Sequence, residues 1–140
     1  MAELCRAFRA YVEPGCGYPV AYPDPGPIQT NTPVGVVNPV SASLVYRGGS
    51  EQEWIDALRL DVVCSAAGVT PQVLASLHAL PEVFADLFSA DDPDKYTLGG
   101  LTDRCALVGY EYGTLDRNGS EYAVGRFTFD VKRHRFAGDD

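Results

Sequence analysis

The segment from Tyr112 to Val131 constrains the fold more than any other part of this 140-residue chain. Two stretches suited to β structure flank Asn118-Gly119, a dipeptide that accepts positive φ angles and closes tight hairpins. In the second stretch, small or apolar residues alternate with polar ones, and the first set is Ala123, Gly125, Phe127, Phe129 and Val131. The pattern predicts a long antiparallel hairpin, Asp103–Asp116 with Ser120–Arg133, that has one face on a core and one polar face.

A second hairpin is predicted between Leu44 and Val63. Ser43–Arg47 is a strand candidate, and Gly48-Gly49-Ser50 supplies the turn. The alternation after the turn puts four residues on one side of a half-buried strand: Leu58, Leu60, Val62 and Cys64.

Two helices are predicted from apolar residues at helical spacing. The first is Ala2–Val12, which the proline and glycines of "PGCGYP" should end. The second is Thr70–Ser89, with Thr70 as the N-cap and Pro71 in the first helical position. Pro81 interrupts its apolar stripe, so we expect a kink or two short helices there.

The segment 14–40 is rich in proline. Six prolines between Pro19 and Pro39 argue against a regular central strand. Short extended pieces remain possible at Pro19–Tyr22 and Val34–Val37, so the segment is either a long ordered loop or a set of edge strands. The other irregular segment is the C-terminal end, 134–140, which is basic and then acidic and is expected to fray as a flexible tail.

These elements together predict one α+β domain covering residues 1–140. Its architecture is a two-layer sandwich, with two helices packed on one face of an antiparallel sheet of about four strands.

Composition narrows the class of function. A 15.1 kDa chain with a net charge of −8 lacks the basic face that specific nucleic-acid binding requires. No apolar run approaches the roughly 20 residues of a membrane span. The N-terminal "MAELCRAFRAYV" does not have the pattern of a signal peptide, so we expect assembly in a cytosol.

The residues that most often carry catalysis or metals form no known motif. His78 and His134 have no partner at metal-ligand spacing, and both are expected to be structural or solvated. The cysteines fit no zinc pattern; Cys64 and Cys105 are expected to be buried thiols, with a disulfide left open. Cys16 lies between glycines as either a reactive thiol or a turn residue.

Short polar motifs are equally weak. "DDPDK" is either part of a calcium loop or a solvated acidic loop, and "GGLTD" and "RGGSE" lack the lysine of a phosphate loop. Asn118-Gly119-Ser120 matches a glycosylation sequon, but the hairpin turn already explains it. We therefore expect no enzyme activity, cofactor or metal.

Opposite charges gather in separate segments. Asp91, Asp92 and Asp94 are acidic, whereas Arg126, Lys132, Arg133 and Arg135 are basic. In a closed ring, the acidic loop of one subunit can meet the basic strand of its neighbour. The alternative is that both are solvated faces, each of which contributes little.

The order of these segments resembles the tail terminator (tail-completion) proteins of long-tailed bacteriophages. The resemblance runs from Leu4 to Arg133, through "LCRAFRAYV", "YPVAYPDP", "SLVYRGGSEQEWIDALRLDVVCSA" and "EYAVGRFTFDVKR". It implies a structural virion protein whose six-fold ring caps the tail tube, ends its polymerisation and provides the surface on which the head or its connector docks.

What the resemblance implies for partners and sites follows from that role. The partners are further copies of the chain, the tail tube protein and a head–tail connector protein, and DNA passes the lumen without being bound. Assembly is implied in the host cytoplasm, at the head-proximal end of the tail. The candidate contact residues are Asp91, Asp92, Asp94, Tyr96 and Leu98 in the acidic loop, and Arg126, Lys132 and Arg133 near the last strand.

Three other functions remain open from the sequence. One is a different head–tail connector, head-closure or minor tail protein. Another is a monomeric binding module that uses the proline-rich segment as its ligand surface. The third is a small enzyme that depends on Cys16 or Cys64.

Overall fold

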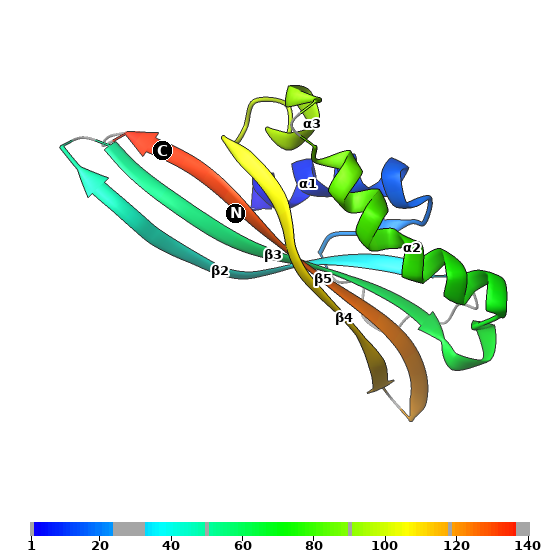
Figure 1. Cartoon of the computed structure of the whole chain (residues 1–140). Helices are drawn as coiled ribbons and strands as arrows, with labels where there is room; N and C mark the ends of the chain where they lie inside the picture. Colours follow the sequence, from blue (N-terminus) through cyan, green and yellow to red (C-terminus); the bar gives the residue numbers. More distant parts are fainter. Residues whose placement is uncertain (1, 24–32, 50, 90, 118, 137–140) are drawn as a thin grey trace.

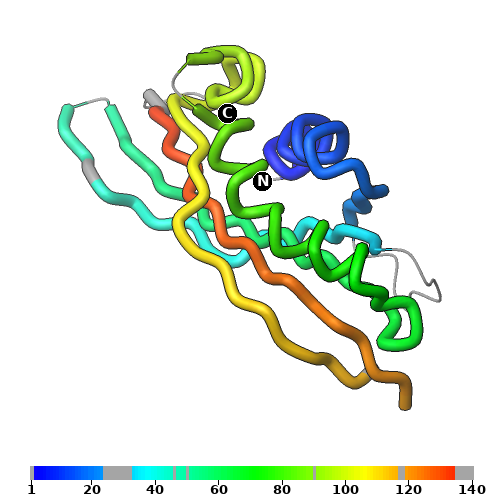
Figure 2. The backbone as a smooth tube through the Cα atoms, turned by 45° about the vertical axis from the view of Figure 1, so that its right-hand side comes forward, coloured from blue at the N-terminus to red at the C-terminus, as the bar shows by residue number. Residues whose placement is uncertain are grey.

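A computed structural model describes residues 2–23, 33–49, 51–89, 91–117 and 119–136. Helices α1 and α2 lie on the same side of one twisted sheet, and two long hairpins extend from it (Figure 1; Figure 2). The elements in chain order are α1 (Ala2–Cys16), β1 (Val20–Ala21), β2 (Val34–Gly48), β3 (Glu51–Ser65), a 3-10 turn (Ala66–Gly68), α2 (Pro71–Leu87), α3 (Pro93–Tyr96), β4 (Arg104–Arg117) and β5 (Ser120–Phe136).

The predicted α+β class is confirmed, but the sheet has five strands rather than about four. Their order is β1-β2-β3-β5-β4. The four long strands pair in antiparallel fashion, and β1 adds a short parallel edge through Val20↔Gly35 and Ala21↔Val36. The helical layer also holds the short α3, which was not predicted as a helix.

Both predicted hairpins are present. The β4–β5 ladder runs from Arg104↔Lys132 to Arg117↔Ser120, and Gly119 beyond it has a φ of 79°. Asn118, expected beside it in the turn, lies outside the described residues. The prediction of a flexible tail is wrong for residues 134–136, because β5 continues to Phe136 and pairs with the start of β3. Residues 137–140 lie outside the described ranges.

The helices continue through prolines that were expected to interrupt them. Helix α1 runs past Val12 and Pro14 to Cys16, and α2 is one helix through Pro81 rather than two short ones. Each proline lacks a backbone donor, yet both helices bury an apolar face whose packing outweighs that local cost. Gly17, at a φ of 77°, follows the last residue of α1 in the left-handed conformation that commonly ends a helix.

Part of the proline-rich segment is also regular. The extended pieces expected at Pro19–Tyr22 and Val34–Val37 are confirmed as β1 and the start of β2, so the edge-strand alternative holds there rather than a continuous loop. Strand β1 pairs with β2 only at Gly35 and Val36, so Pro39 lies where the described chain offers no second ladder that would need its N–H. Residues 24–32 of this segment are outside the described ranges.

The main core lies between the helices and the sheet. The Phe129 ring on β5 lies 4.8 Å from that of Phe8 on α1 and 5.5 Å from that of Phe84 on α2. The alternation predicted for β3 is confirmed, since Leu58, Leu60, Val62 and Cys64 are all fully buried.

The opposite face of the sheet was expected to be polar throughout, and that expectation is wrong at one end. A small apolar cluster forms there where β3, β5 and β4 meet, and it consists of Val63, Tyr122, Val124 and Leu115. The rest of that face carries the charges described below.

Candidate functional site

The face of the sheet opposite α1 and α2, here called the open face, carries charged side chains from β3, β4 and β5. Alternation fixes this arrangement, because the residues between the buried positions of each strand must point away from the core. The charged residues include Glu53, Arg59 and Asp61 on β3, Arg126, Asp130 and Lys132 on β5, and Glu111 on β4. Among the described residues no helix covers this face (Figure 1).

A hollow of about 400 Å³ crosses the middle of the open face. Four strands contribute to it, and we call it the four-strand hollow. Its lining residues are Val40 from β2, Arg59 from β3, Gly109, Tyr110 and Glu111 from β4, and Arg126 and Thr128 from β5. The strand register brings these lining residues together, because Arg59 of β3 pairs with Thr128 of β5, and Thr128 pairs with Gly109 of β4.

Two β-bulges shape the ends of this hollow. The register of β2 shifts between Pro39 and Ser41, and that of β4 shifts between Leu107 and Gly109. The extra residues are Val40 and Val108, which are 55% and 56% exposed. A bulge interrupts the regular pairing of strands and changes the direction of a side chain. At these positions β2 and β4 therefore expose a valine side chain where a regular strand would continue its hydrogen-bonded pairing.

The two guanidinium groups of the hollow differ in how firmly they are held. Arg59 Nε lies 3.1 Å from Asp61 Oδ2, and the same oxygen accepts a hydrogen bond from Asn38 at 3.0 Å. Arg126 lies 3.8 Å from Glu111 Oε1, and its Nε has no hydrogen-bond partner in the described part of the chain. Arg126 is therefore a donor with unused capacity.

The predicted acidic loop lies with the helices, away from the open face. Tyr11 of α1 donates a hydrogen bond to Asp94 Oδ2 at 3.2 Å, and Lys95 pairs with Asp92 at 3.5 Å. Asp91 and Asp94 are exposed. Partial desolvation, followed by the charge of Asp94, raises the pKa of Tyr11.

The two remaining candidates of this loop face inward. Tyr96 packs against the core, and Leu98 is buried within it at a φ of 51°. Leu98 therefore has little surface to offer a partner.

All three predicted basic residues have carboxylate partners in the same chain, and two of these pairs are closer than the one between Arg126 and Glu111. Lys132 Nζ lies 2.8 Å from Glu53 Oε1, and Arg133 pairs with the fully buried Asp56. The hydrogen bond and charge of Glu53 raise the pKa of Lys132. Lys132 and Arg133 thus pair with Glu53 and Asp56 rather than with Asp91, Asp92 or Asp94, so a meeting between copies stays a prediction.

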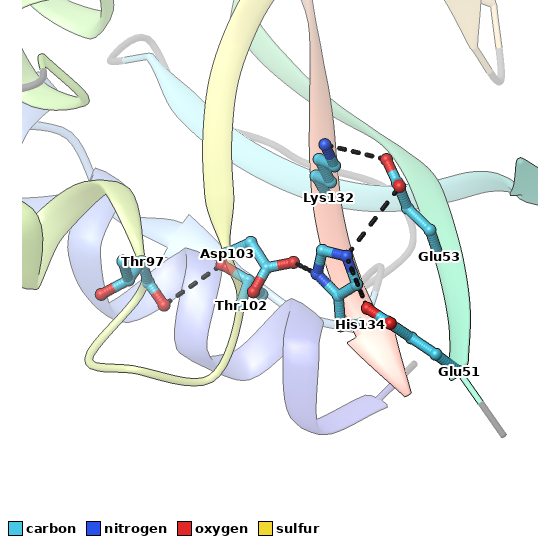
Figure 3. Close-up of polar contacts among 7 residues, drawn as sticks. All are labelled: Glu51, Glu53, Thr97, Thr102, Asp103, Lys132 and His134. Carbon is cyan, nitrogen blue, oxygen red and sulfur yellow. Dashed lines mark hydrogen bonds and ion pairs between the residues drawn. The ribbon is translucent and has the colours of Figure 1, made fainter. Parts of the chain in front are cut away.

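A second polar cluster lies where β3 begins and β5 ends (Figure 3). His134 Nδ1 contacts Asp103, while Nε2 lies 3.3 Å from Glu51 Oε1 and 3.9 Å from Glu53 Oε2. His134 is exposed, as expected, and the extended β5 also brings it between these carboxylates. Through His134, these contacts connect Asp103, which precedes β4, to Glu51 at the start of β3.

The four cysteines have no disulfide partner. Burial raises the pKa values of Cys5, Cys16, Cys64 and Cys105. A reactive thiol needs a lowered pKa, so the environment of Cys16 is the opposite of what the enzyme hypothesis requires. His78 is also accounted for structurally, since its ring packs edge-on against Tyr112 at 4.8 Å.

Neither a metal site nor a membrane helix is found where the chain is described. The histidine, cysteine, aspartate and glutamate side chains of those ranges form no group able to hold a metal ion. No helix there is long and apolar enough to cross a membrane.

Sequence reasoning missed Arg59 as a site residue. It placed Arg59 on the polar side of its strand, but only the pairing of β3 with β5 brings Arg59 beside Arg126 and Thr128. The bulge that adds Val40 to the same hollow left no signal in the residue pattern.

Comparison with known proteins gives no family for this chain. No family model matches the sequence, and no curated protein matches it. Among 27 matching solved chains, one superimposes with a TM-score of 0.49 and 13% identity, over 96% of this chain and 97% of its own length.

Proposed function

We propose that this chain is a structural virion protein of a long-tailed bacteriophage, of the tail terminator type. It forms a ring of identical subunits, six by the resemblance, that caps the tail tube, ends its polymerisation and provides the head-docking surface. Its partners are its own copies, the tail tube protein and a head–tail connector protein. No cofactor takes part, and assembly takes place in the host cytoplasm.

One observation carries this proposal: the order and layering of the elements. A first helix, a short edge strand, a hairpin, a second helix and a last hairpin follow one another, with both main helices on one face of the sheet. That is the layout on which the resemblance to tail terminators rests. The net charge of −8 also supports it, because an acidic channel wall repels the DNA that passes.

The first experiment measures the mass of the purified full-length chain by light scattering across a concentration series. It is then repeated with purified tail tubes of the phage that encodes the chain, and tube ends are imaged by electron microscopy. We expect a hexamer, either free or bound at one tube end. A chain that stays monomeric at every concentration and leaves the tubes bare would overturn the proposal.

The second measurement separates a terminator from other connector proteins. Tube protein is polymerised in the presence of increasing amounts of the chain, and tube lengths are measured. A terminator shortens the tubes and stops their extension at the capped end. A ring that binds tubes without limiting their length would instead identify a different connector or minor tail protein.

A further inference from the structure

We infer that the four-strand hollow receives the acidic loop of a second copy of this chain. The inference rests on the proposed ring, and it assigns the contact that joins neighbouring subunits. It pairs Arg59 and Arg126 in the hollow with Asp91 and Asp94 in the loop.

Charge complementarity supports this choice of occupant. The charged lining residues of the hollow are Arg59, Arg126 and Glu111, and Asp61 lies beside Arg59, so the hollow offers two guanidinium groups in a chain whose net charge is −8. The segment from Asp91 to Asp103 has four aspartates and one lysine, so it is strongly negative. Opposite potentials of this kind steer association and fix the register of two surfaces.

The exposure and pairing of the two guanidinium groups also support the acidic loop as the occupant of the hollow. Arg59 and Arg126 have side chains that are 38% and 37% exposed. The pairing of Arg126 with Glu111 is loose, at 3.8 Å, and Glu111 is itself 74% exposed. An incoming carboxylate can therefore reach the exposed part of the Arg126 guanidinium without breaking a tight ion pair.

The placement of the two surfaces makes the contact intermolecular. The loop is anchored to α1 through Tyr11 and Asp94, on the helical side of the sheet. The hollow lies on the opposite face, so the sheet separates a loop from its own hollow. A contact between two different surfaces is heterologous, and such contacts generate rings when the rotation closes.

A charge-exchange experiment tests the pairing. One variant carries Asp91→Arg and Asp94→Arg, and the other carries Arg59→Glu and Arg126→Glu. Each is assayed under the conditions in which the wild-type ring forms. We expect each variant to need a concentration about tenfold or more above wild type for half-assembly, because like charges then face one another.

The equimolar mixture gives the decisive result. The basic loop of the first variant fits the acidic hollow of the second, and the acidic loop of the second fits the basic hollow of the first. We therefore expect the mixture to assemble near the wild-type concentration, into rings in which the two variants alternate. Native mass spectrometry of variants that differ in isotope labelling measures that alternation.

Control variants change the same number of charges elsewhere. Glu82→Arg with Asp86→Arg alters exposed positions of α2, and Arg6→Glu with Arg104→Glu alters exposed positions of α1 and β4. We expect both control pairs to assemble like wild type. Circular dichroism checks that each reversal variant is folded. A variant that has lost the wild-type spectrum is replaced by a milder pair, either Asp91→Asn with Asp94→Asn or Arg59→Gln with Arg126→Gln.

The outcomes distinguish this contact from the proposed function. Suppose that the wild-type protein forms rings. If the reversal variants then assemble like wild type, or if their mixture fails to assemble, the contact is overturned while the proposed ring stands. Wild-type protein that forms no ring, with or without tail tubes, overturns the proposed function itself. Recovery in the mixture, together with normal control variants, supports both.

Discussion

Arg133 on β5 holds the carboxylate of Asp56 on β3 at the end of an otherwise apolar core. The Arg133 guanidinium contacts both carboxylate oxygens, one of them at 3.2 Å, and also lies 6.0 Å from the centre of the Trp54 ring. Asp56 is fully buried, whereas Arg133 keeps 30% of its side chain exposed. The pair is thus asymmetric, since only the aspartate has no access to water.

Removing the arginine should therefore cost more than removing the aspartate. We expect Arg133→Met to lower the free energy of unfolding by about 3 kcal/mol, because it leaves a buried carboxylate unpaired. Asp56→Asn should cost less, and the double variant Asp56→Leu with Arg133→Leu should recover most of the loss. Urea unfolding followed by the fluorescence of Trp54, the single tryptophan, measures all three. Equal losses in the two single variants would contradict this asymmetry.

The aromatic contacts at Phe129 define a second prediction. Its ring contacts those of Phe8, Phe84 and Phe88, which joins β5 to both main helices and to the residue that follows α2. We expect Phe129→Ala to cost about 3–5 kcal/mol, through lost burial and the cavity that remains. Tyr110→Ala is the control, since Tyr110 is 56% exposed and should cost far less. Chemical denaturation of both variants checks the difference, and similar losses would disprove it.

The strands were predictable because the residue patterns that specify them lie within short stretches of the sequence. Alternation and the turn residues set both hairpins, and Phe127 and Phe129 on the core face follow directly from it. Helix α1 was predicted to end before Pro14, and a division of α2 at Pro81 was one of two alternatives. Neither occurs, because the local cost of a proline is visible in the sequence while the packing that offsets it is not. Pro81 lies inside a helix in which Leu77, Leu80 and Phe84 are buried. The apolar stripe in the sequence predicted a buried face, but not how much its packing would offset the cost of the proline.

The site was less predictable than the fold. The acidic loop and Arg126 were recognised from charge, but Arg59 and Val40 join the hollow only through strand register and a bulge. Charge alone also gave no sign that Arg133 is paired with a buried aspartate. Such pairings depend on long-range contacts, which a pattern with a period of two residues does not encode.

The N-cap of α2 offers a local test. Thr70 Oγ1 accepts a hydrogen bond from the backbone N–H of Val73 at 3.2 Å. We expect Thr70→Ala to lower the free energy of unfolding by about 1 kcal/mol, because that donor loses its partner. Thr70→Ser keeps the hydroxyl and should stay close to wild type. Thermal unfolding by circular dichroism compares the three proteins, and a destabilised serine variant would show that the cap is not the cause.

Stability should also fall at alkaline pH because of Cys105. Burial raises the pKa of its thiol well above the ordinary value of 9.0. Above pH 9.0 the unfolded chain releases this proton while the folded chain keeps it, so the free energy of unfolding decreases as pH rises. One thiol contributes a slope of up to about 1.4 kcal/mol per pH unit.

The variant Cys105→Ala removes that contribution and keeps the other three thiols. We expect its unfolding free energy to decline less steeply than that of wild type from about pH 9 to about pH 10.5. Urea denaturation at several pH values gives both slopes. Parallel curves for the two proteins would show that Cys105 does not titrate differently in the folded and unfolded chains.

The four-strand hollow has a consequence for the order of events in building a ring. Its lining runs from Val40 to Thr128, so it exists only after the last hairpin has paired with β3. A subunit still lacking that hairpin would present no receptor for its neighbour's loop. If the proposed contact forms, chains whose last hairpin has not yet paired are left out of the ring, so that completion of folding decides which subunits assemble.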